Sequence, residues 1–182
     1  MMNIVYFDRV LSPLGEMVLA SDGDALSGAW FDGQRYQPPI GPAWQRRPDL
    51  PLLRRAAAEF AKYFAGERIA FSLPLAPVGT LFQRDVWRAI ASVPYGETIA
   101  YCELAARAGR PKSIRAAGAA TGRNPLSIIV PCHRIVGADG ALTGYAGGLA
   151  RKRALLALEH AAIAAAPAPR LAPVAAFAHA PT

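Results

Sequence analysis

The hydrophobic positions in the first third of the chain form short runs broken by turn residues. Three such runs lie at 3–11, 15–21 and 25–32, separated by the segments SPLGE and SDGD. Runs of this kind predict an antiparallel meander of strands. Residues 37–48 are rich in proline and predict a loop. Across 49–68 the apolar residues recur at helical spacing and Gly66 is a stop signal, so we expect a helix there, with another strand at 69–75.

After a linker at 76–80 the pattern changes to helices. Three helices are expected, at 80–93, 98–109 and 112–124. Thr80 is placed to cap the first helix, and Gly109 ends the second. Two helices joined by a short turn form a helix-turn-helix signature, although many ordinary helix pairs share it.

The rest of the chain predicts one more folded segment and a tail. A buried strand, a glycine-rich loop and a last helix are expected at 126–130, 136–148 and 148–160. Residues 161–182 contain eleven alanines and four prolines without periodicity, which predicts a mostly disordered tail. The pattern therefore predicts an α/β (α+β) protein with an N-terminal unit at 1–78 and a C-terminal unit at 79–160.

The composition narrows the class of protein. The chain has 182 residues, of which 53% are hydrophobic and 18% charged, as in folded proteins of one large or two small domains. No apolar run approaches the length of a membrane span, and no export signal is visible. The two cysteines, Cys102 and Cys132, cannot form a disulfide framework, so we expect a reduced, cytoplasmic location. With only three histidines and scattered cysteines, we expect no zinc site.

The net charge of +7 is concentrated in the second unit. Residues 80–160 carry eleven Lys/Arg and five Asp/Glu, whereas residues 1–79 carry eight of each. A basic domain is a candidate for binding nucleic acid, because neutralised phosphates release their counterions. A solvated basic surface is the alternative.

The segment LSIIVPCHRIV, residues 126–136, carries the candidate chemistry. A cysteine is a useful nucleophile only as a thiolate, which requires a nearby base or cation. In a strand, Cys132 and His133 would face opposite ways, so cooperation requires the backbone to turn near Pro131. Arg134 adds positive potential, and Glu159 on the last helix could orient the imidazole. An inert buried thiol is the alternative, and we expect that role for Cys102.

The motifs around this segment resemble the O6-alkylguanine-DNA alkyltransferases (methylated-DNA–protein-cysteine methyltransferases) of bacteria. The similarity runs through FQRDVW, VPYGETIAY, ELAARAGRPKSIRAAGAATGRNP, PCHRIV and TGYAGGLARKRALLALE. It implies a ribonuclease-H-like α/β domain followed by a helical, winged-helix-like DNA-binding domain that holds the active site. Two residues depart from the usual motif, because Leu158 and His160 flank Glu159 where the family has His and Gly.

The resemblance also implies roles for individual residues. Cys132 would accept the alkyl group, His133 would act as base through a water, and Glu159 would orient His133. Two further residues would act in positioning and hydrogen bonding: Asn124 would link the helix-turn-helix to the active site, and Tyr101 would donate a hydrogen bond to guanine N3. The implied DNA contacts are Arg115, which would fill the gap of the flipped nucleotide, Ala116 and Ala117 on the small-residue helix, and Arg134. The implied base pocket consists of Tyr145, Ala146 and Gly147 in the pocket loop, with the backbone carbonyls of Cys132 and Ile135 receiving the guanine amino group. Several of these residues have an alternative role. Arg115 could be an ordinary surface residue and Tyr101 a packing residue, while Asn124 could be a helix cap and the alanines could simply pack against the neighbouring helix.

The expected function is repair of DNA by stoichiometric transfer of a methyl or small alkyl group from O6 of guanine to Cys132, and the sequence leaves activity on O4 of thymine open. A thioether is not hydrolysed, so we expect a single turnover, with no cofactor. The partner would be double-stranded DNA containing O6-alkylguanine, the protein a monomer, and no membrane would be involved. The alternatives are a sensor of alkylated DNA, a transcriptional regulator, and a cysteine hydrolase or acyltransferase with true turnover.

Overall fold

The structure, a computed structural model, describes residues 4–67 and 70–165. Its N-terminal part is a four-stranded sheet in the order β3-β2-β1-β4. The strands are β1 (Val5–Val10), β2 (Met17–Ser21), β3 (Leu26–Phe31) and β4 (Trp44–Arg46). The first three form the predicted antiparallel meander. Strand β4 lies within the segment 37–48, which the sequence predicts to be a loop, and it pairs parallel with β1. A three-residue strand beside prolines leaves little periodicity to detect.

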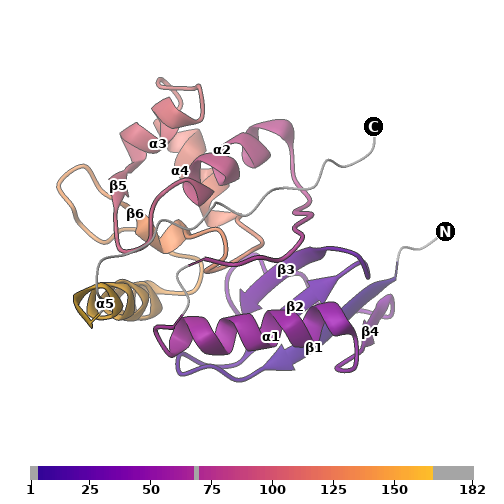
Figure 1. Cartoon of the computed structure of the whole chain (residues 1–182). Coiled ribbons are helices and arrows are strands. Elements are labelled where there is room, and N and C mark those ends of the chain that lie inside the picture. Colours follow the sequence, from indigo (N-terminus) through magenta and orange to yellow (C-terminus); the bar gives the residue numbers. More distant parts are fainter. Residues whose placement is uncertain (1–3, 68–69, 166–182) are drawn as a thin grey trace.

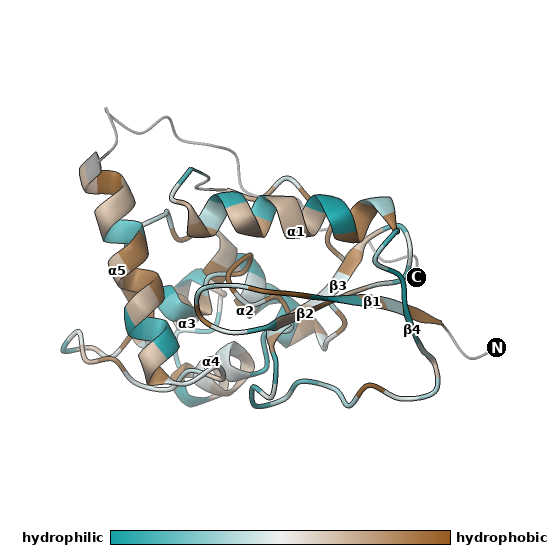
Figure 2. Cartoon of the chain, turned by 90° about the horizontal axis from the view of Figure 1, so that it is seen from below, coloured by the Kyte–Doolittle hydropathy of each residue, from teal (hydrophilic) through white to brown (hydrophobic). Residues whose placement is uncertain are grey.

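Helix α1 (Pro51–Phe64) lies across one face of this sheet (Figure 1). It buries Leu53, Ala56, Phe60 and Tyr63, and hydrophobic and hydrophilic residues alternate along it (Figure 2). The strand expected at 69–75 is not regular over the described residues 70–75, where Leu75 forms an isolated bridge to Leu26. Residues 68–69 lie outside the described residues.

The second part contains the predicted helices. Helix α2 (Leu81–Ala91) begins with a capping box between Thr80 and Gln83, as the Thr80 signal predicts. The segment expected as one helix at 98–109 is instead a short strand, β5 (Ile99–Ala100), followed by α3 (Tyr101–Arg107). Gly109, with φ of 71°, makes the turn to α4 (Ile114–Gly122). The helix-turn-helix arrangement is therefore present, and α2 is tied to α4 by the Trp87 indole, which donates to the Ala120 carbonyl at 2.9 Å.

The prediction of a strand at 126–130 is wrong. This segment is buried but forms only isolated bridges, to Ala29 of β3 and within itself, and Ile128 has a φ of 73°. A left-handed Ile cannot continue a strand. The apolar run reflects the position of this loop in the core that both parts of the molecule share.

The chain then makes a 3-10 turn, η1 (Cys132–Arg134), and a short strand, β6 (Ile135–Val136), that pairs parallel with β5. After the glycine-rich loop comes α5 (Leu149–Ala165), which runs beyond the predicted end at 160. The rest of the predicted tail, 166–182, lies outside the described residues. Within residues 4–67 and 70–165, no helix has the length and apolarity to cross a membrane.

Candidate active site

The turn expected near Pro131 is present, and the side chains of Cys132 and His133 on it have different hydrogen-bond partners. Pro131 has φ −79° and ψ 64°, and the three following residues form a single 3-10 turn. Cys132, His133 and Arg134 are all buried. The turn directs the thiol and the imidazole to different partners, which define two sides of the site: a carboxylate side around Glu159 and a thiol side around Cys132.

On the carboxylate side, Glu159 is fully buried among donors. Its Oε1 lies 2.7 Å from His133 Nε2 and accepts from Arg134 Nη2 at 2.8 Å. Its Oε2 accepts from Arg134 Nε at 2.9 Å and from the Gly96 backbone N–H at 3.0 Å. The predicted pair of His133 and Glu159 is therefore brought together.

The charge of Glu159 fixes the tautomer of His133. Burial alone would raise the pKa of Glu159, but the hydrogen bonds from His133 and Arg134, together with the charge of Arg134, outweigh it and hold the pKa well below its ordinary value. Glu159 is thus an ionised acceptor, and the proton between the two residues lies on His133 Nε2. His133 Nδ1 then carries a lone pair, and it has no hydrogen-bond partner among the described residues. Burial also lowers the pKa of His133, so the imidazole is neutral and able to accept a proton.

On the thiol side, Asn124 contacts the sulfur directly. Its side-chain amide donates to Cys132 Sγ at 3.2 Å and to the Val130 carbonyl at 2.7 Å, while its oxygen accepts from the Leu126 N–H at 2.9 Å. This places Asn124 between the end of α4 and the active-site segment, as expected. Burial raises the pKa of the Cys132 thiol, while Asn124 and the charge of Lys152 lower it.

Lys152 is a further residue of this side, and the sequence pattern did not single it out. It is fully buried on α5, and its Nζ donates to the backbone carbonyls of Ile135 at 2.6 Å and Thr143 at 2.7 Å. Burial lowers the pKa of Lys152 to about 8. The signal in the sequence is its spacing: Lys152 precedes Glu159 by seven residues, which is two helical turns and hence the same helix face.

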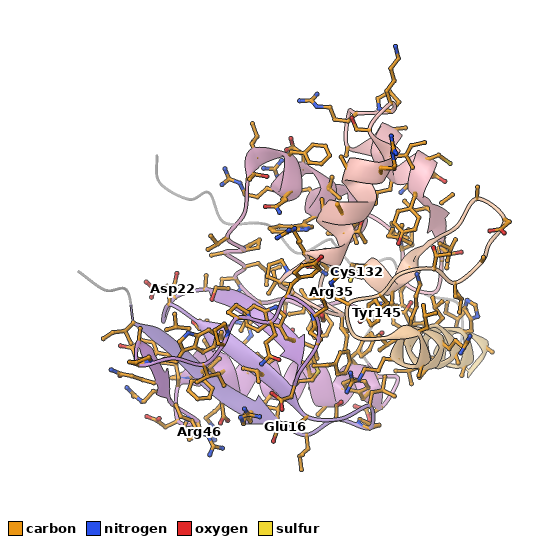
Figure 3. All side chains as sticks on the ribbon, turned by 180° about the vertical axis from the view of Figure 1, so that it is seen from behind. Glu16, Asp22, Arg35, Arg46, Cys132 and Tyr145 are labelled. Atoms are coloured by element: carbon orange, nitrogen blue, oxygen red, sulfur yellow. The ribbon has the colours of Figure 1, made fainter. Side chains whose placement is uncertain are left out.

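A pocket of about 290 Å³ lies between the pocket loop, α3 and α4. Of the predicted residues, Tyr101, Tyr145 and Ala146 line it, together with Arg35 and Tyr36 from the sheet domain. Figure 3 shows Arg35, Cys132 and Tyr145 in one region of the molecule, and the Arg35 N–H donates to the Ala146 carbonyl at 3.1 Å. Gly147 is buried, and a side chain there would press on Phe31 and Tyr145. Nothing in the sequence pattern of 32–37 pointed to this pocket.

Two predicted DNA or substrate contacts, Ala117 and Arg134, are buried in the structure, and the Ile135 carbonyl is shared with Lys152. Ala117 is fully buried in the core, so it packs inside the helical domain, whereas Arg115 and Ala116 are exposed on α4. Arg134 is buried and paired with Glu159, so its charge is neutralised and does not face DNA. The Ile135 carbonyl already accepts from Lys152, which occupies one of its two lone pairs.

The described residues include no cluster of three or more His, Cys, Asp or Glu side chains suited to a metal ion. Cys102 is exposed on α3 rather than packed in the core, and neither described cysteine forms a disulfide.

Comparisons with known proteins cover both halves of the chain. The family model of the 6-O-methylguanine DNA methyltransferase ribonuclease-like domain matches residues 5–77, and that of the DNA binding domain matches residues 81–161. Methylated-DNA–protein-cysteine methyltransferase of Haemophilus influenzae is 44% identical over 159 residues, which cover 87% of this chain and 88% of that protein. The Mycobacterium tuberculosis protein of the same name is 44% identical over 156 residues, covering 86% and 93%.

The solved structures agree with these matches. The structure of Mycobacterium tuberculosis OGT in complex with DNA superposes with a TM-score of 0.81 at 42% identity, covering 86% of this chain and 94% of that one. A second structure, of the Mycobacterium tuberculosis O6-methylguanine methyltransferase, also superposes with a TM-score of 0.81, at 43% identity and covering 91% of this chain. The predicted fold class is confirmed, and the chain belongs to the methylated-DNA–protein-cysteine methyltransferase family.

Proposed function

We propose that the protein repairs DNA by moving a methyl or small alkyl group from O6 of guanine to the sulfur of Cys132. The observation that carries this proposal is the PCHR turn in a chain of this family. It holds a cysteine within electrostatic range of Tyr101 and Tyr145, which line the pocket, and a histidine against a buried glutamate. The relatives are named for this reaction and share most of their length with the chain.

The proton of the thiol moves to His133 in the proposed reaction. Because burial raises the pKa of Cys132, the resting sulfur holds its proton, and the neutral imidazole accepts it at Nδ1 through a water as the S–C bond forms. The imidazolium produced is stabilised by the ionised Glu159 at 2.7 Å. Asn124 and Lys152 stabilise the negative charge that develops on sulfur.

Guanine leaves as the O6–carbon bond breaks, and its electron pair must be neutralised. Tyr101 lines the pocket, and burial raises the pKa of its hydroxyl, which therefore keeps its proton and donates a hydrogen bond to N3 of the departing base. The proton that His133 took from the thiol balances the charge of the released guanine. The product sulfur is a thioether, which water does not hydrolyse, so each protein molecule accepts one alkyl group. No step of the proposed reaction requires a cofactor.

Access to O6 requires the nucleotide to leave the base stack, at a cost of a few kcal/mol. We propose that α4 meets the DNA, with Ala116 permitting close approach and Arg115 occupying the gap. Both are exposed on this helix, and the basic charge of the helical domain supports the placement. The pocket loop with Tyr145, Ala146 and Gly147 would then enclose the flipped base.

We also propose a division of the chain into units 1–78 and 79–160, supported by two separate family models. Action in the reducing cytoplasm fits the two cysteines, which lie outside any disulfide.

Mass spectrometry of the protein after incubation with O6-methylguanine DNA tests the reaction. We expect the mass of one methyl group on the peptide that contains Cys132, none on Cys132→Ser, and full uptake on Cys102→Ser. Continued product formation beyond one methyl per protein would instead indicate a hydrolase, and binding without any gain in mass would indicate a sensor.

A further inference from the structure

The N-terminal domain reaches the carboxylate side of the active site through one hydroxyl. Tyr63 lies in the last turn of α1 and is 1% exposed. Its Oη donates to Glu159 Oε1 at 2.8 Å, and Figures 1 and 2 both show the end of α1 beside α5. Since an ionised carboxylate only accepts hydrogen bonds, the hydroxyl is the donor. The domain that carries neither the cysteine nor the DNA-binding helices therefore contacts the group that orients the base.

The oxygen that Tyr63 contacts is the one that faces His133. Oε1 accepts from Tyr63, His133 and Arg134, whereas Oε2 accepts from Arg134 and the Gly96 backbone. Donors that share one oxygen compete for its charge, because each withdraws electron density from it. The Tyr63 hydroxyl thus limits how strongly Oε1 attracts the proton on His133, and it fixes where that oxygen lies.

We propose that Tyr63 is a positioning residue for alkyl transfer, which acts through Glu159 to set the orientation and basicity of His133. The inference rests on the proposed function, because His133 must be the base. It assigns a role in the chemistry to the N-terminal domain.

The surroundings of His133 include several other groups that bear on its basicity. They are Glu159 and Lys152 on α5 and Arg134 and Cys132 in the same turn. Tyr95 and Tyr145 lie within electrostatic range of Glu159, but their raised pKa values keep both hydroxyls uncharged at neutral pH, so they add no charge near His133. Arg134 and Lys152 disfavour the imidazolium, and Glu159 favours it. Removing the Tyr63 hydroxyl leaves all of these in place, so its effect on His133 has one sign: Oε1 holds the imidazolium more strongly, and the imidazole becomes more basic.

The chain offers a matched control for this hydroxyl. Tyr95 packs against Tyr63 with ring centroids 6.1 Å apart, and its buried hydroxyl has no hydrogen-bond partner among the described residues. Tyr63→Phe and Tyr95→Phe each remove one buried oxygen from the same aromatic cluster and keep the ring. Only the first removes a hydrogen bond to Glu159.

The experiment measures the single-turnover rate of methyl transfer from a duplex containing O6-methylguanine, from pH 5 to pH 9, in the full chain and both variants. For Tyr63→Phe we expect the plateau rate to fall about three- to tenfold, because Glu159 and His133 lose a hydrogen bond that fixes their orientation, and this loss outweighs the gain in basicity. The fall is a small part of the ~100-fold or more that a general base contributes. We expect its acid limb to move to higher pH by about half a unit. Uptake at completion stays at one methyl per protein, and affinity for an undamaged duplex is unchanged. Tyr95→Phe should match the unmodified chain throughout.

Two results would overturn the inference while leaving the proposed function intact. One is an unchanged rate and pH profile in Tyr63→Phe. The other is a slower Tyr63→Phe with an unmoved acid limb, since a merely structural hydroxyl would lower the rate without altering the basicity of His133. If the unmodified chain takes up no methyl group, the proposed function itself is wrong.

Discussion

The two sides of the Cys132–Arg134 turn are both buried, yet they treat charge in opposite ways. On the carboxylate side an ion pair is enclosed and every oxygen of Glu159 has donors, so the charge is permanent. On the thiol side a neutral sulfur receives one amide N–H and lies near one buried ammonium, and burial raises its pKa. One side is organised around a charge that is always present, and the other around a charge that appears only during reaction.

This difference explains why both histidine and cysteine can be buried without forming a resting ion pair. The imidazole is kept neutral because burial lowers its pKa, and the thiol is kept protonated because burial raises its own. The proton transfer between them is therefore unfavourable until an electrophilic carbon arrives. A site arranged in this way protects its single-use sulfur from incidental reaction.

The largest effect is expected from removing the permanent charge. Glu159→Gln leaves Arg134 buried without a carboxylate and His133 facing a neutral amide with only one acceptor oxygen, so we expect a loss of about 3–5 kcal/mol in the free energy of unfolding. Methyl transfer should slow by about 100-fold. Urea unfolding and single-turnover kinetics measure the two quantities.

The pH dependence of that stability difference has a defined sign. Because the pKa of Glu159 is lowered in the folded protein, its contribution is fully present above the ordinary glutamate value of 4.5 and is lost as pH falls below it. The gap between the unmodified chain and Glu159→Gln should narrow with acid. A gap that is constant from pH 7 to pH 3 would contradict the assignment of an ionised Glu159.

A smaller effect is expected on the thiol side from Asn124→Ala. The change removes two amide donations and leaves the Leu126 N–H without its acceptor, which should lower the free energy of unfolding by about 2–3 kcal/mol. It should also raise the pKa of Cys132, measured by pH-dependent thiol alkylation. Ser127→Ala is the control, because it removes a buried hydrogen bond to Gln34 in the same segment without touching the sulfur.

Lys152→Met tests the thiol side a second time, with a smaller expected effect on the rate of methyl transfer. Methionine keeps the length of the side chain but removes the ammonium, so the thiolate loses a stabilising charge and we expect transfer to slow about three- to tenfold. The folded pKa of Lys152 is about 8, below its ordinary 10.5, so the protonated form opposes folding. The free energy of unfolding of the unmodified chain, relative to the variant, should therefore rise between those two pH values. A fall over that range would show that the ammonium is a net stabiliser.

Local signals predicted the fold where the physics is local. The Thr80 cap, the Gly109 turn and the meander before residue 32 each depend on neighbours in sequence, and the structure has all three. The expected strand at 126–130 failed because its burial comes from long-range packing, not from pairing. Its register with Ala29 is set by hydrogen bonds that no periodicity records.

The candidate site was predictable where a motif and a reaction demanded particular atoms. Cys132, His133 and Glu159 follow from the need for nucleophile, base and orienting carboxylate, but Lys152 and Arg134 did not behave as their residue types suggest. Within RKR, Lys152 looks like part of a solvated basic surface, and Arg134 beside a cysteine looks like a positive charge aimed at it. Burial exchanges these roles: Arg134 is neutralised by Glu159, and Lys152 provides the charge near sulfur.

The smallest effect is expected from Cys102, the thiol on the surface of α3. Cys102→Ser should change the free energy of unfolding by less than about 0.5 kcal/mol and leave methyl transfer unaltered, because the side chain is exposed and is not part of the site.

The unmodified chain, which keeps both thiols, allows the accessibility of each thiol to be compared with its reactivity. With a bulky maleimide, peptide mapping should find Cys102 modified before Cys132, since Cys132 is 4% exposed. With methylated DNA the order should reverse completely, because the pocket and the base act on Cys132 alone. Faster maleimide labelling of Cys132 would mean that its sulfur is already an accessible thiolate at rest, and the contrast between the two sides of the turn would be wrong.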